Sequence, residues 1–340
     1  MTSTYRAMQV TPARTLELVA RPTPRPAAGE ALIAVDACGV CGADAADIAG
    51  ADLSLTPPRV PGHEVVGRII ALGENVAPIW RIGQRVGVGR KGGHCLQCEL
   101  CRRGLFHLCT DQPVLGATCD GGYAEMLLVR STALVSIPDA FGAAEAAPIL
   151  CAGVATFNAL KKCGAEPGER VAIVGIGGLG HMALQYARRM GFEVVAVGRG
   201  AAIAQDALEL GAHRYLDARN EDAPRALRRM GGAAAIVCTV ADPATVSGLV
   251  AGLAPRGRLV VLSAGKEAIA VAAGLLVGGE RSVSGSITGT PCDCEKALNF
   301  SALTGARARI ETMPLEEANA ACERMRSGQA TFRMVLTMAR

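Results

Sequence analysis

No run of about eighteen uncharged apolar residues occurs in this 340-residue sequence, so it predicts no helix that crosses a bilayer. The segment Met1–Val10 has no basic stretch followed by an apolar one, and a secretory signal is therefore not expected. The net charge of +4 is spread along the chain, and arginine pairs such as Arg102-Arg103 are typical of solvated helix faces rather than of nucleic-acid binding. These absences favour a cytoplasmic protein that binds neither a membrane nor nucleic acid.

Thirteen cysteines are an odd number for a disulfide framework, and no export signal accompanies them. Metal binding is the better explanation for a subset of six that falls into motifs. The other seven, Cys38 among them, are expected to be small buried hydrophobic residues.

The chain has two regions with different sequence patterns, which predict two domains. One compact core also rarely spans 340 residues. Up to about residue 150, short apolar runs such as Ala31–Val35 and Arg85–Val88 alternate with turns, as in a β-rich region. From Glu169 onward, apolar strands alternate with helices, the pattern of a doubly wound parallel α/β sheet. We expect strands at 171–174, 193–197, 234–238, 259–262 and 283–287, and helices at 179–190, 201–210 and 243–251.

A glycine-rich loop opens the first of these helices. Directly after a predicted strand, its sequence is Gly175-Ile176-Gly177-Gly178-Leu179-Gly180. Glycines at these places allow a tight turn and let backbone N–H groups approach a pyrophosphate at the positive end of the helix. In its strand–loop–helix context, the loop predicts a dinucleotide site.

The end of the next strand decides between the two nicotinamide cofactors. An acidic residue there would bind the ribose 2′-hydroxyl of NAD, but the chain has Val197-Gly198-Arg199-Gly200. A guanidinium suits a 2′-phosphate, because arginine can hold phosphate through two parallel hydrogen bonds. NADP(H) is therefore favoured over NAD(H). The alternative is that Arg199 is a solvated loop residue and NAD binds less tightly.

Four cysteines lie close together in the sequence: Cys95, Cys98, Cys101 and Cys109. Four thiolates on a short loop suffice for a closed tetrahedral zinc site. An iron–sulfur cluster also begins with repeated two-residue gaps, but its pattern normally has a shorter last gap and a proline after the final cysteine, where this chain has Thr110. A structural zinc is the favoured interpretation.

A second set of metal-ligand types is dispersed: Cys41, His63 and Cys151. Spacing alone does not pair them, and each has a simpler explanation as a buried thiol or core histidine. Three protein ligands with an open fourth position are, however, what catalytic zinc requires. Such a metal would polarise a carbonyl oxygen while hydride moves at the carbon.

These motifs together resemble those of the zinc-dependent medium-chain alcohol dehydrogenases, over essentially the whole chain. The stretch Gly62–Gly67 is similar to the family's zinc signature, Cys38–Cys41 with Asp44 to its first-ligand motif, and Pro148–Gly153 to the segment that holds its last ligand. The four-cysteine loop and the glycine loop follow in the family's order.

The resemblance implies a GroES-like, β-rich catalytic domain at 1–152 and 288–340 and a Rossmann domain at 153–287, with an active site in the cleft between them. It also implies two zinc ions per chain, a homodimer or homotetramer, and interconversion of an alcohol and an aldehyde or ketone.

Individual roles follow from the same resemblance. It implies Cys41, His63 and Cys151 as ligands of the catalytic zinc, with Glu64 as a carboxylate able to approach the metal. Asp44 would orient His63 through the second ring nitrogen. Arg333 stands where the family often places a pyrophosphate contact, although an arginine there could equally lie on the surface.

Two alanines depart from the family pattern. Members usually carry Ser or Thr at the position of Ala43, and many carry His at that of Ala46, to pass a proton between the reacting oxygen and solvent. Either water or a cofactor ribose hydroxyl replaces this relay, or the substrate is an imine or iminium ion, which leaves no oxygen to protonate.

An alcohol dehydrogenase or carbonyl reductase remains the favoured interpretation. One alternative is an imine reductase, and another is a catalytically weak nucleotide-binding or redox-sensing protein. The three intact zinc ligands argue against a zinc-free C=C reductase of the wider superfamily.

Arg90 is a further departure, because the family often has a large aromatic residue of the substrate pocket at this position. A guanidinium there could hold a substrate carboxylate or phosphate through a charge-assisted contact. The interpretation slightly favoured is that Arg90 and Lys91 point into solvent from a strand end.

Overall fold

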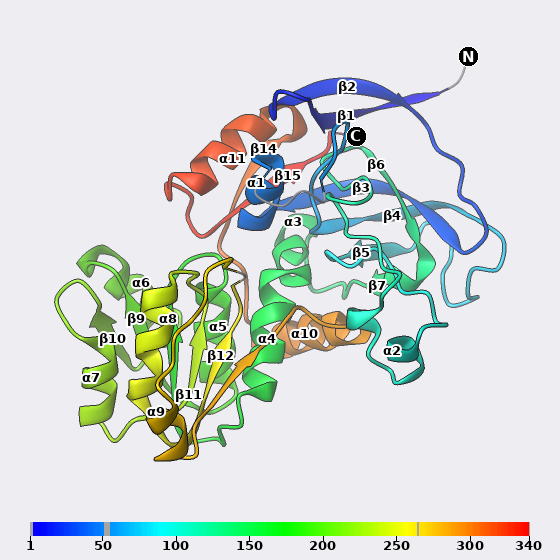
Figure 1. Ribbon diagram of the computed structural model, residues 1–340. Helices are drawn as coiled ribbons and strands as arrows, with labels where there is room; N and C mark the ends of the chain where they lie inside the picture. The colour runs from blue at the N-terminus through cyan, green and yellow to red at the C-terminus, as the bar shows by residue number, and fades with distance from the viewer. Residues whose placement is uncertain (1–2, 51–54, 264, 340) are drawn as a thin grey trace. The chain divides into compact units, whose positions relative to one another are not determined.

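The computed structural model describes residues 3–50, 55–263 and 265–339, and the chain divides into two compact units (Figure 1). Residues 1–2, 51–54, 264 and 340, which belong to the predicted domains, lie outside the described residues. The first unit comprises Met1–Cys151, Gly289–Leu303 and Arg307–Arg340, and the second comprises Ala152–Thr288 and Thr304–Ala306.

The first unit is rich in β-structure, as its short apolar runs predict. A hairpin of β1 and β2 accompanies a seven-stranded sheet of order β14-β15-β3-β4-β5-β7, in which β6 pairs with β3. The strands are β1 Thr4–Val10, β2 Leu16–Pro22, β3 Glu30–Val40, β4 Val65–Leu72, β5 Arg85–Val88, β6 Met126–Arg130, β7 Val135–Ser136, β14 Ile310–Pro314 and β15 Arg333–Thr337.

Short helices connect these strands. The α-helices are α1 Gly42–Ile48, α2 Glu99–Arg102, α3 Ala143–Ala146, α10 Pro291–Thr304 and α11 Ala318–Arg326, and the 3₁₀ helices are Phe106–Leu108, Ser131–Ala133, Ala147–Leu150 and Leu315–Glu317. The core beneath the sheet is built from branched apolar residues such as Ile33, Ile69 and Val86, all fully buried. Strand β3 lies in the middle of this sheet, because it pairs with β4, β6 and β15. Cys41 directly follows β3, so the sheet fixes the position of this residue.

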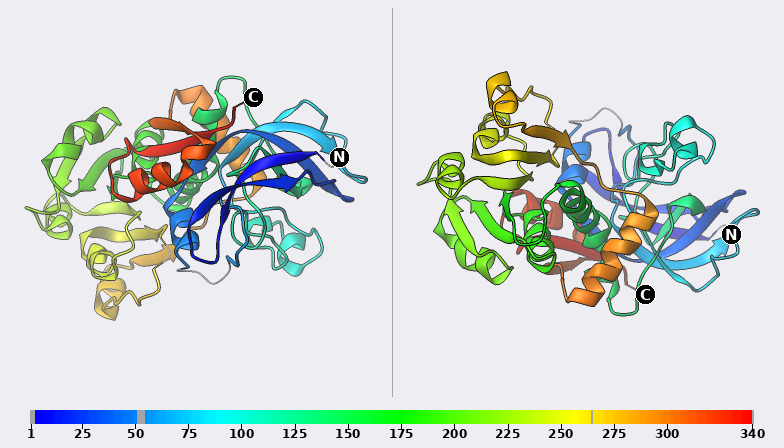
Figure 2. Two further views of the ribbon diagram at one scale, coloured as in Figure 1. Left: turned by 90° about the horizontal axis from the view of Figure 1, so that it is seen from above. Right: turned by 90° about the horizontal axis from the view of Figure 1, so that it is seen from below.

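The second unit is a doubly wound α/β fold (Figure 2). Its six strands are parallel neighbours in the order β10-β9-β8-β11-β12-β13, which is the Rossmann order, so the predicted fold class is confirmed. The strands are β8 Arg170–Val174, β9 Glu193–Gly198, β10 Arg214–Asp217, β11 Ala233–Cys238, β12 Leu253–Val261 and β13 Ser282–Gly285.

The helices of this unit are α4 Ala152–Lys162, α5 Gly180–Arg189, α6 Ala204–Glu209, α7 Ala223–Arg229, α8 Pro243–Leu249 and α9 Ala273–Val277, with 3₁₀ turns at Ala201–Ile203 and Val250–Gly252. The predicted helix 201–210 is therefore a 3₁₀ turn followed by α6. Strand β10 and helix α7 are not predicted by the sequence pattern. At the β8–β11 boundary the strand order reverses, and such a switch point is where doubly wound sheets bind ligands.

Among the described residues, no single helix has both the length and the apolar composition to cross a membrane; one pair of consecutive helices passes that test only when taken together.

Candidate metal and nucleotide sites

Four potential metal ligands of the first unit converge from separate elements. Cys41 follows β3 and begins α1, His63 and Glu64 precede β4, and Cys151 follows a 3₁₀ turn. One ligand atom from each lies within 4.8 Å of the other three, and His63 Nε2 is 3.3 Å from Cys151 Sγ. The structure thus brings together residues that sequence spacing alone could not pair.

Asp44 determines which nitrogen of His63 faces the thiols. Its Oδ1 lies 2.6 Å from His63 Nδ1, while its Oδ2 accepts hydrogen bonds from the Cys41 N–H at 2.9 Å and the Tyr123 hydroxyl at 3.2 Å. Asp44, His63 and Tyr123 are all at most 1% exposed. With Nδ1 committed to a carboxylate, Nε2 is left for a metal, as in carboxylate–histidine–zinc arrangements.

Tyr123 reaches Asp44 because two loops lie close together. Gly62 has φ +99°, and a side chain there would overlap the Tyr123 ring. The Tyr123 N–H donates to Pro61 O at 2.9 Å, and the Gly121 N–H donates to Val60 O at 2.7 Å. Sequence reasoning missed Tyr123, since nothing local connects it with a residue 79 positions earlier.

Arg333 on β15 pairs with Glu64 inside the first unit. Their side chains are 4% and 0% exposed, and Arg333 Nη2 donates to Glu64 Oε1. The interpretation of Arg333 as a surface residue is therefore wrong. Burial raises the pKa of Glu64 to about 7, against the effect of Arg333. The other oxygen, Oε2, is buried without a hydrogen-bond partner among the described residues, which fits a carboxylate beside a metal.

The donor set fits zinc. Two thiols, an imidazole and a neighbouring carboxylate are the ligand types that zinc prefers. The hydrogen bond from Cys151 brings the pKa of Cys41 well below its ordinary value, which favours the thiolate. Burial lowers the pKa of His63, but Asp44 outweighs it and the pKa rises to about 10.

Arg90 lies beside this cluster rather than in solvent. Its side chain is only 22% exposed, and its Nη2 is 2.9 Å from Oδ2 of Asp47, whose side chain is 5% exposed. Its Nη1 is 3.5 Å from His63 Nδ1. The solvent-facing interpretation of Arg90 is wrong, because a buried carboxylate on α1 holds its guanidinium. Burial raises the pKa of Asp47, and Arg90 opposes that shift.

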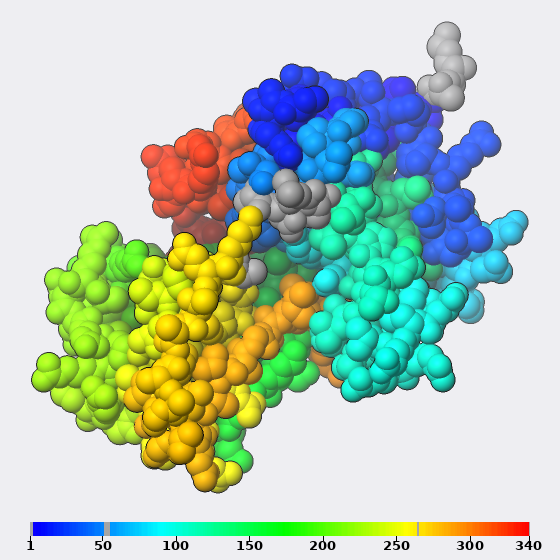
Figure 3. Space-filling view, viewed as in Figure 1, coloured from blue at the N-terminus to red at the C-terminus, as the bar shows by residue number. Residues whose placement is uncertain are grey.

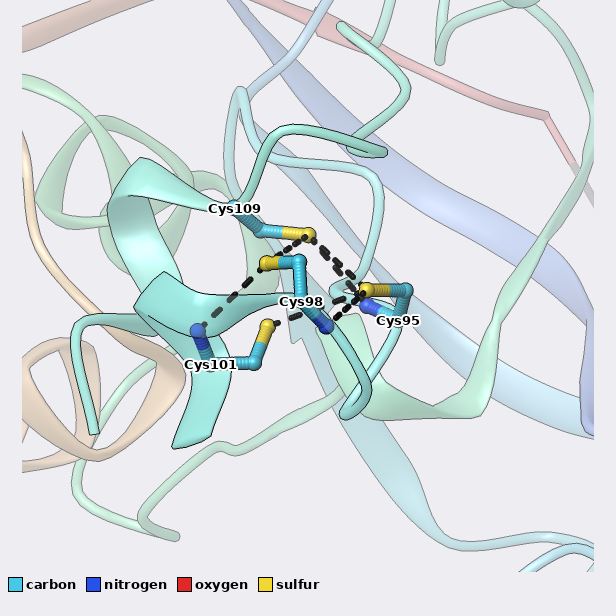
Figure 4. Close-up of side chains that lie close together, drawn as sticks. All are labelled: Cys95, Cys98, Cys101 and Cys109. Atoms are coloured by element: carbon cyan, nitrogen blue, oxygen red, sulfur yellow. Dashed lines mark hydrogen bonds between the residues drawn. The ribbon is translucent and has the colours of Figure 1, made fainter. Parts of the chain in front are cut away.

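The four clustered cysteines surround a second candidate zinc site at the surface of the first unit, in the cyan region of Figure 3. Their Sγ atoms point toward one another (Figure 4), with separations of 4.0 Å for Cys95–Cys101, 3.9 Å for Cys98–Cys109 and 3.5 Å for Cys95–Cys109. Four sulfurs at about 2.3 Å from one zinc lie about 3.8 Å apart in a tetrahedron. The observed separations fit that geometry.

Backbone N–H groups favour the thiolate form of two of these cysteines, Cys95 and Cys98. Gln97 and Cys98 each donate to Cys95 Sγ at 3.4 Å, and Cys101 donates to Cys98 Sγ at 3.5 Å. Leu96 takes φ +63° to make this turn. The bond from Cys101 is the main cause that lowers the pKa of Cys98 to about 6. Because all four Sγ atoms lie within 4.8 Å of one another, the geometry favours one ion over a multi-atom iron–sulfur cluster.

The glycine loop of the second unit borders a cavity of about 740 Å³ at the switch point. Gly175 has φ +89°, and a side chain at Gly180 would overlap the Gly175 carbonyl, so α5 begins tight against the loop. Gly178 and Leu179 lead into α5. The loop, the end of β9 and the segment after β11 contribute lining residues that include Gly175, Gly177, Gly198, Arg199 and Val240.

The turn after β9 is held by β10 and the residues behind it. The Tyr215 hydroxyl donates to Gly200 O at 2.7 Å, and Asp217 Oδ1 accepts from the N–H groups of Gly200 at 2.7 Å and Arg219 at 3.0 Å. The Arg219 guanidinium lies beside Gly200, next to the exposed Arg199. The guanidinium of Arg219 and the exposed Arg199 therefore lie at the end of β9, and the Asp217 carboxylate at the same turn is engaged by backbone N–H groups.

Two family models match the chain. One, described as alcohol dehydrogenase GroES-like domain, covers residues 27–139, and the other, described as zinc-binding dehydrogenase, covers residues 178–302. The first match confirms the GroES-like character predicted for the β-rich domain.

Known proteins match nearly the full length. An alcohol dehydrogenase patD of Penicillium expansum is 42% identical over 95% of this chain and 94% of its own length. An alcohol dehydrogenase of Geobacillus stearothermophilus is 39% identical over 92% of this chain and 93% of its own. Among solved structures, a cinnamyl alcohol dehydrogenase of Sorghum bicolor is 29% identical, covers 98% of both chains and has a TM-score of 0.89.

Proposed function

This chain belongs to the zinc-containing medium-chain alcohol dehydrogenase family, and we propose that it interconverts an alcohol and an aldehyde or ketone with NADP(H) as hydride carrier. The observation that carries the proposal is the largely buried set of Cys41, His63, Glu64 and Cys151, with ligand atoms within 4.8 Å of one another. Alcohol dehydrogenases that match more than nine tenths of both lengths support the same class of reaction.

Cys41, His63 and Cys151 are proposed to hold the catalytic zinc, which supplies Lewis acidity to the substrate oxygen. Asp44 keeps His63 Nε2 toward the metal, and Arg333 holds Glu64 beside the ligands. In the reducing direction, NADPH held at the loop of Gly175, Gly177 and Gly180 would supply hydride for the carbonyl carbon, and a proton from solvent would complete the alcohol. Cys95, Cys98, Cys101 and Cys109 are proposed to hold a structural zinc.

The proton must travel without a side-chain relay from α1, because Ala43 and Ala46 carry no exchangeable proton. Ala46 is exposed and Ala43 is half-buried, so solvent reaches this turn of the helix. We propose that water or a cofactor ribose hydroxyl carries the proton.

The preference for NADP(H) is supported by the two guanidinium groups at the end of β9. Arg199 lines the cavity, and Arg219 lies beside Gly200. Asp217 is engaged by two backbone N–H groups, which makes it a poor candidate for binding a ribose hydroxyl. Arginine pairs favour phosphate, and the 2′-phosphate distinguishes NADP from NAD.

Reduction of an imine or iminium ion is the second candidate reaction, favoured by the same two alanines. An iminium carbon becomes an amine by accepting hydride alone, and no oxygen needs a proton. Reduction of a carbonyl group remains the first candidate reaction, because the zinc ligand set is complete.

The test is consumption of NADPH by the zinc-loaded protein against matched aldehydes and cyclic imines. Turnover of aldehydes supports the proposal. Turnover confined to imines would mean that the protein is an imine reductase and that Ala43 and Ala46 reflect this change of reaction. Tight NADPH binding without turnover of any substrate would favour a nucleotide-binding or redox-sensing role.

A further inference from the structure

We propose that Arg90 and Asp47 form one neutral pair that positions the Asp44–His63 arm of the metal site, so that Arg90 does not anchor an anionic substrate. The substrates preferred by the wild-type protein are then neutral carbonyl compounds or alcohols. This inference rests on the proposed function, because it names the substrate class of that site.

The pair lies on the Nδ1 side of His63. Arg90 Nη2 contacts Asp47 Oδ2 at 2.9 Å, and Nη1 comes within 3.5 Å of His63 Nδ1. Nδ1 already faces Asp44 at 2.6 Å, so the guanidinium flanks the histidine–carboxylate bond rather than replacing it. Arg90 therefore supports the side of His63 that faces away from Cys41 and Cys151.

Charge balance explains why an arginine is needed here. Asp44 and Asp47 lie three residues apart on α1, which places them on one face of the helix. The two residues are 1% and 3% exposed, and two carboxylates this close and this buried repel each other. Arg90 contacts Asp47 directly and lies next to the bond that Asp44 makes with His63. One cation thus offsets the second carboxylate.

The same contact lowers the attraction of Arg90 for a substrate anion. A guanidinium that already holds a buried carboxylate has one face engaged and its charge largely compensated. An incoming carboxylate would also meet the field of Asp47 behind the guanidinium. Removing the Asp47 charge should therefore release Arg90 for anion binding.

The first experiment measures zinc release to a chromophoric chelator from Arg90→Gln, Asp47→Asn and the double variant. Release of the catalytic zinc is identified as the kinetic phase that is missing from the time course of Cys151→Ser. Arg90→Gln leaves Asp47 without its cation, and we expect release about tenfold faster than in wild type, in line with the effect of outer ligand partners. The double variant restores charge balance and should release zinc more slowly than Arg90→Gln alone.

The second experiment compares kcat/KM for benzaldehyde and 4-carboxybenzaldehyde. Wild type should prefer benzaldehyde. In Asp47→Asn, the ratio of kcat/KM for 4-carboxybenzaldehyde to that for benzaldehyde should rise at least tenfold, because the KM for the carboxylated aldehyde falls. The matched control is Arg326→Gln with Glu323→Gln, which removes an exposed ion pair on α11 of the same unit and should change neither readout.

Two results would overturn the inference. If wild type prefers the anionic aldehyde and Arg90→Gln loses that preference through KM alone, Arg90 is a substrate anchor. If the double variant releases zinc as fast as the single Arg90 variant, the two residues are not coupled. Absence of turnover with every carbonyl would refute the proposed function, whereas the zinc-release experiment would still decide the coupling.

Discussion

The Tyr123 hydroxyl offers a sharp test of how the metal site is held, because Tyr123→Phe removes one oxygen and keeps the ring. The hydroxyl donates to Asp44 Oδ2 at 3.2 Å, with both residues at most 1% exposed. A hydrogen bond to a charged group contributes about 1.5–3 kcal/mol. The length exceeds the usual range for O–H···O bonds, and the Cys41 N–H still donates to the same oxygen. The lower value, about 1.5 kcal/mol, therefore applies.

This loss should appear in two measurements. At about 2–4 °C per kcal/mol for a unit of this size, the Tm of the zinc-loaded protein should fall by about 3–6 °C. Loosening Asp44 frees His63 to turn, so release of the catalytic zinc should be about tenfold faster. Tyr5→Phe is the matched control, since Tyr5 is a buried tyrosine on β1. If Tyr123→Phe releases zinc at the wild-type rate, the hydroxyl does not hold Asp44 against His63 and the reasoning is refuted.

Three further predictions concern other parts of the chain. Arg199→Ala should lower the ratio of kcat/KM for NADPH to that for NADH about tenfold or more, because a charge-assisted contact contributes about 1.5–3 kcal/mol; an unchanged ratio in steady-state kinetics would assign Arg199 to solvent. Cys109→Ser should reduce bound zinc by one ion, measured by elemental analysis, and lower Tm; two ions retained would contradict the four-thiolate site. Arg333→Met should cost about 3–5 kcal/mol in chemical denaturation, because it leaves Glu64 buried without its cation, and Arg333→Met with Glu64→Gln should cost less.

Much of the fold follows from the sequence because its signals are local. The glycine loop lies between a strand and a helix, and the apolar runs of the second half recur at the spacing of a doubly wound sheet. Strand β10 escaped prediction because Arg214–Asp217 is only four residues long and has a charged residue at each end. Helix α7 escaped because Ala223–Arg229 carries little apolar periodicity. Tertiary pairing with β9 stabilises β10, and such pairing leaves no signature in a short segment.

The candidate metal ligands could be named from motifs, but their supports could not. Tyr123 and Arg333 reach Asp44 and Glu64 from positions 79 and 269 residues away, and no spacing rule connects them. The one local signal was Asp47, a second acidic residue three positions after Asp44 on the same helix face. A buried carboxylate at that place requires a cation. This requirement would have predicted that Arg90 lies beside the metal site rather than in solvent.

The most direct test of the central claim compares wild type with Cys151→Ser, with bound zinc, NADPH binding and aldehyde turnover measured on the same preparations. We expect wild type to hold two zinc ions and reduce aldehydes. The variant should hold one ion, bind NADPH as wild type does, and lose at least a thousandfold in kcat, because Lewis-acid stabilisation of several kcal/mol is gone. A variant that keeps wild-type turnover with one zinc would contradict zinc-dependent hydride transfer at this site.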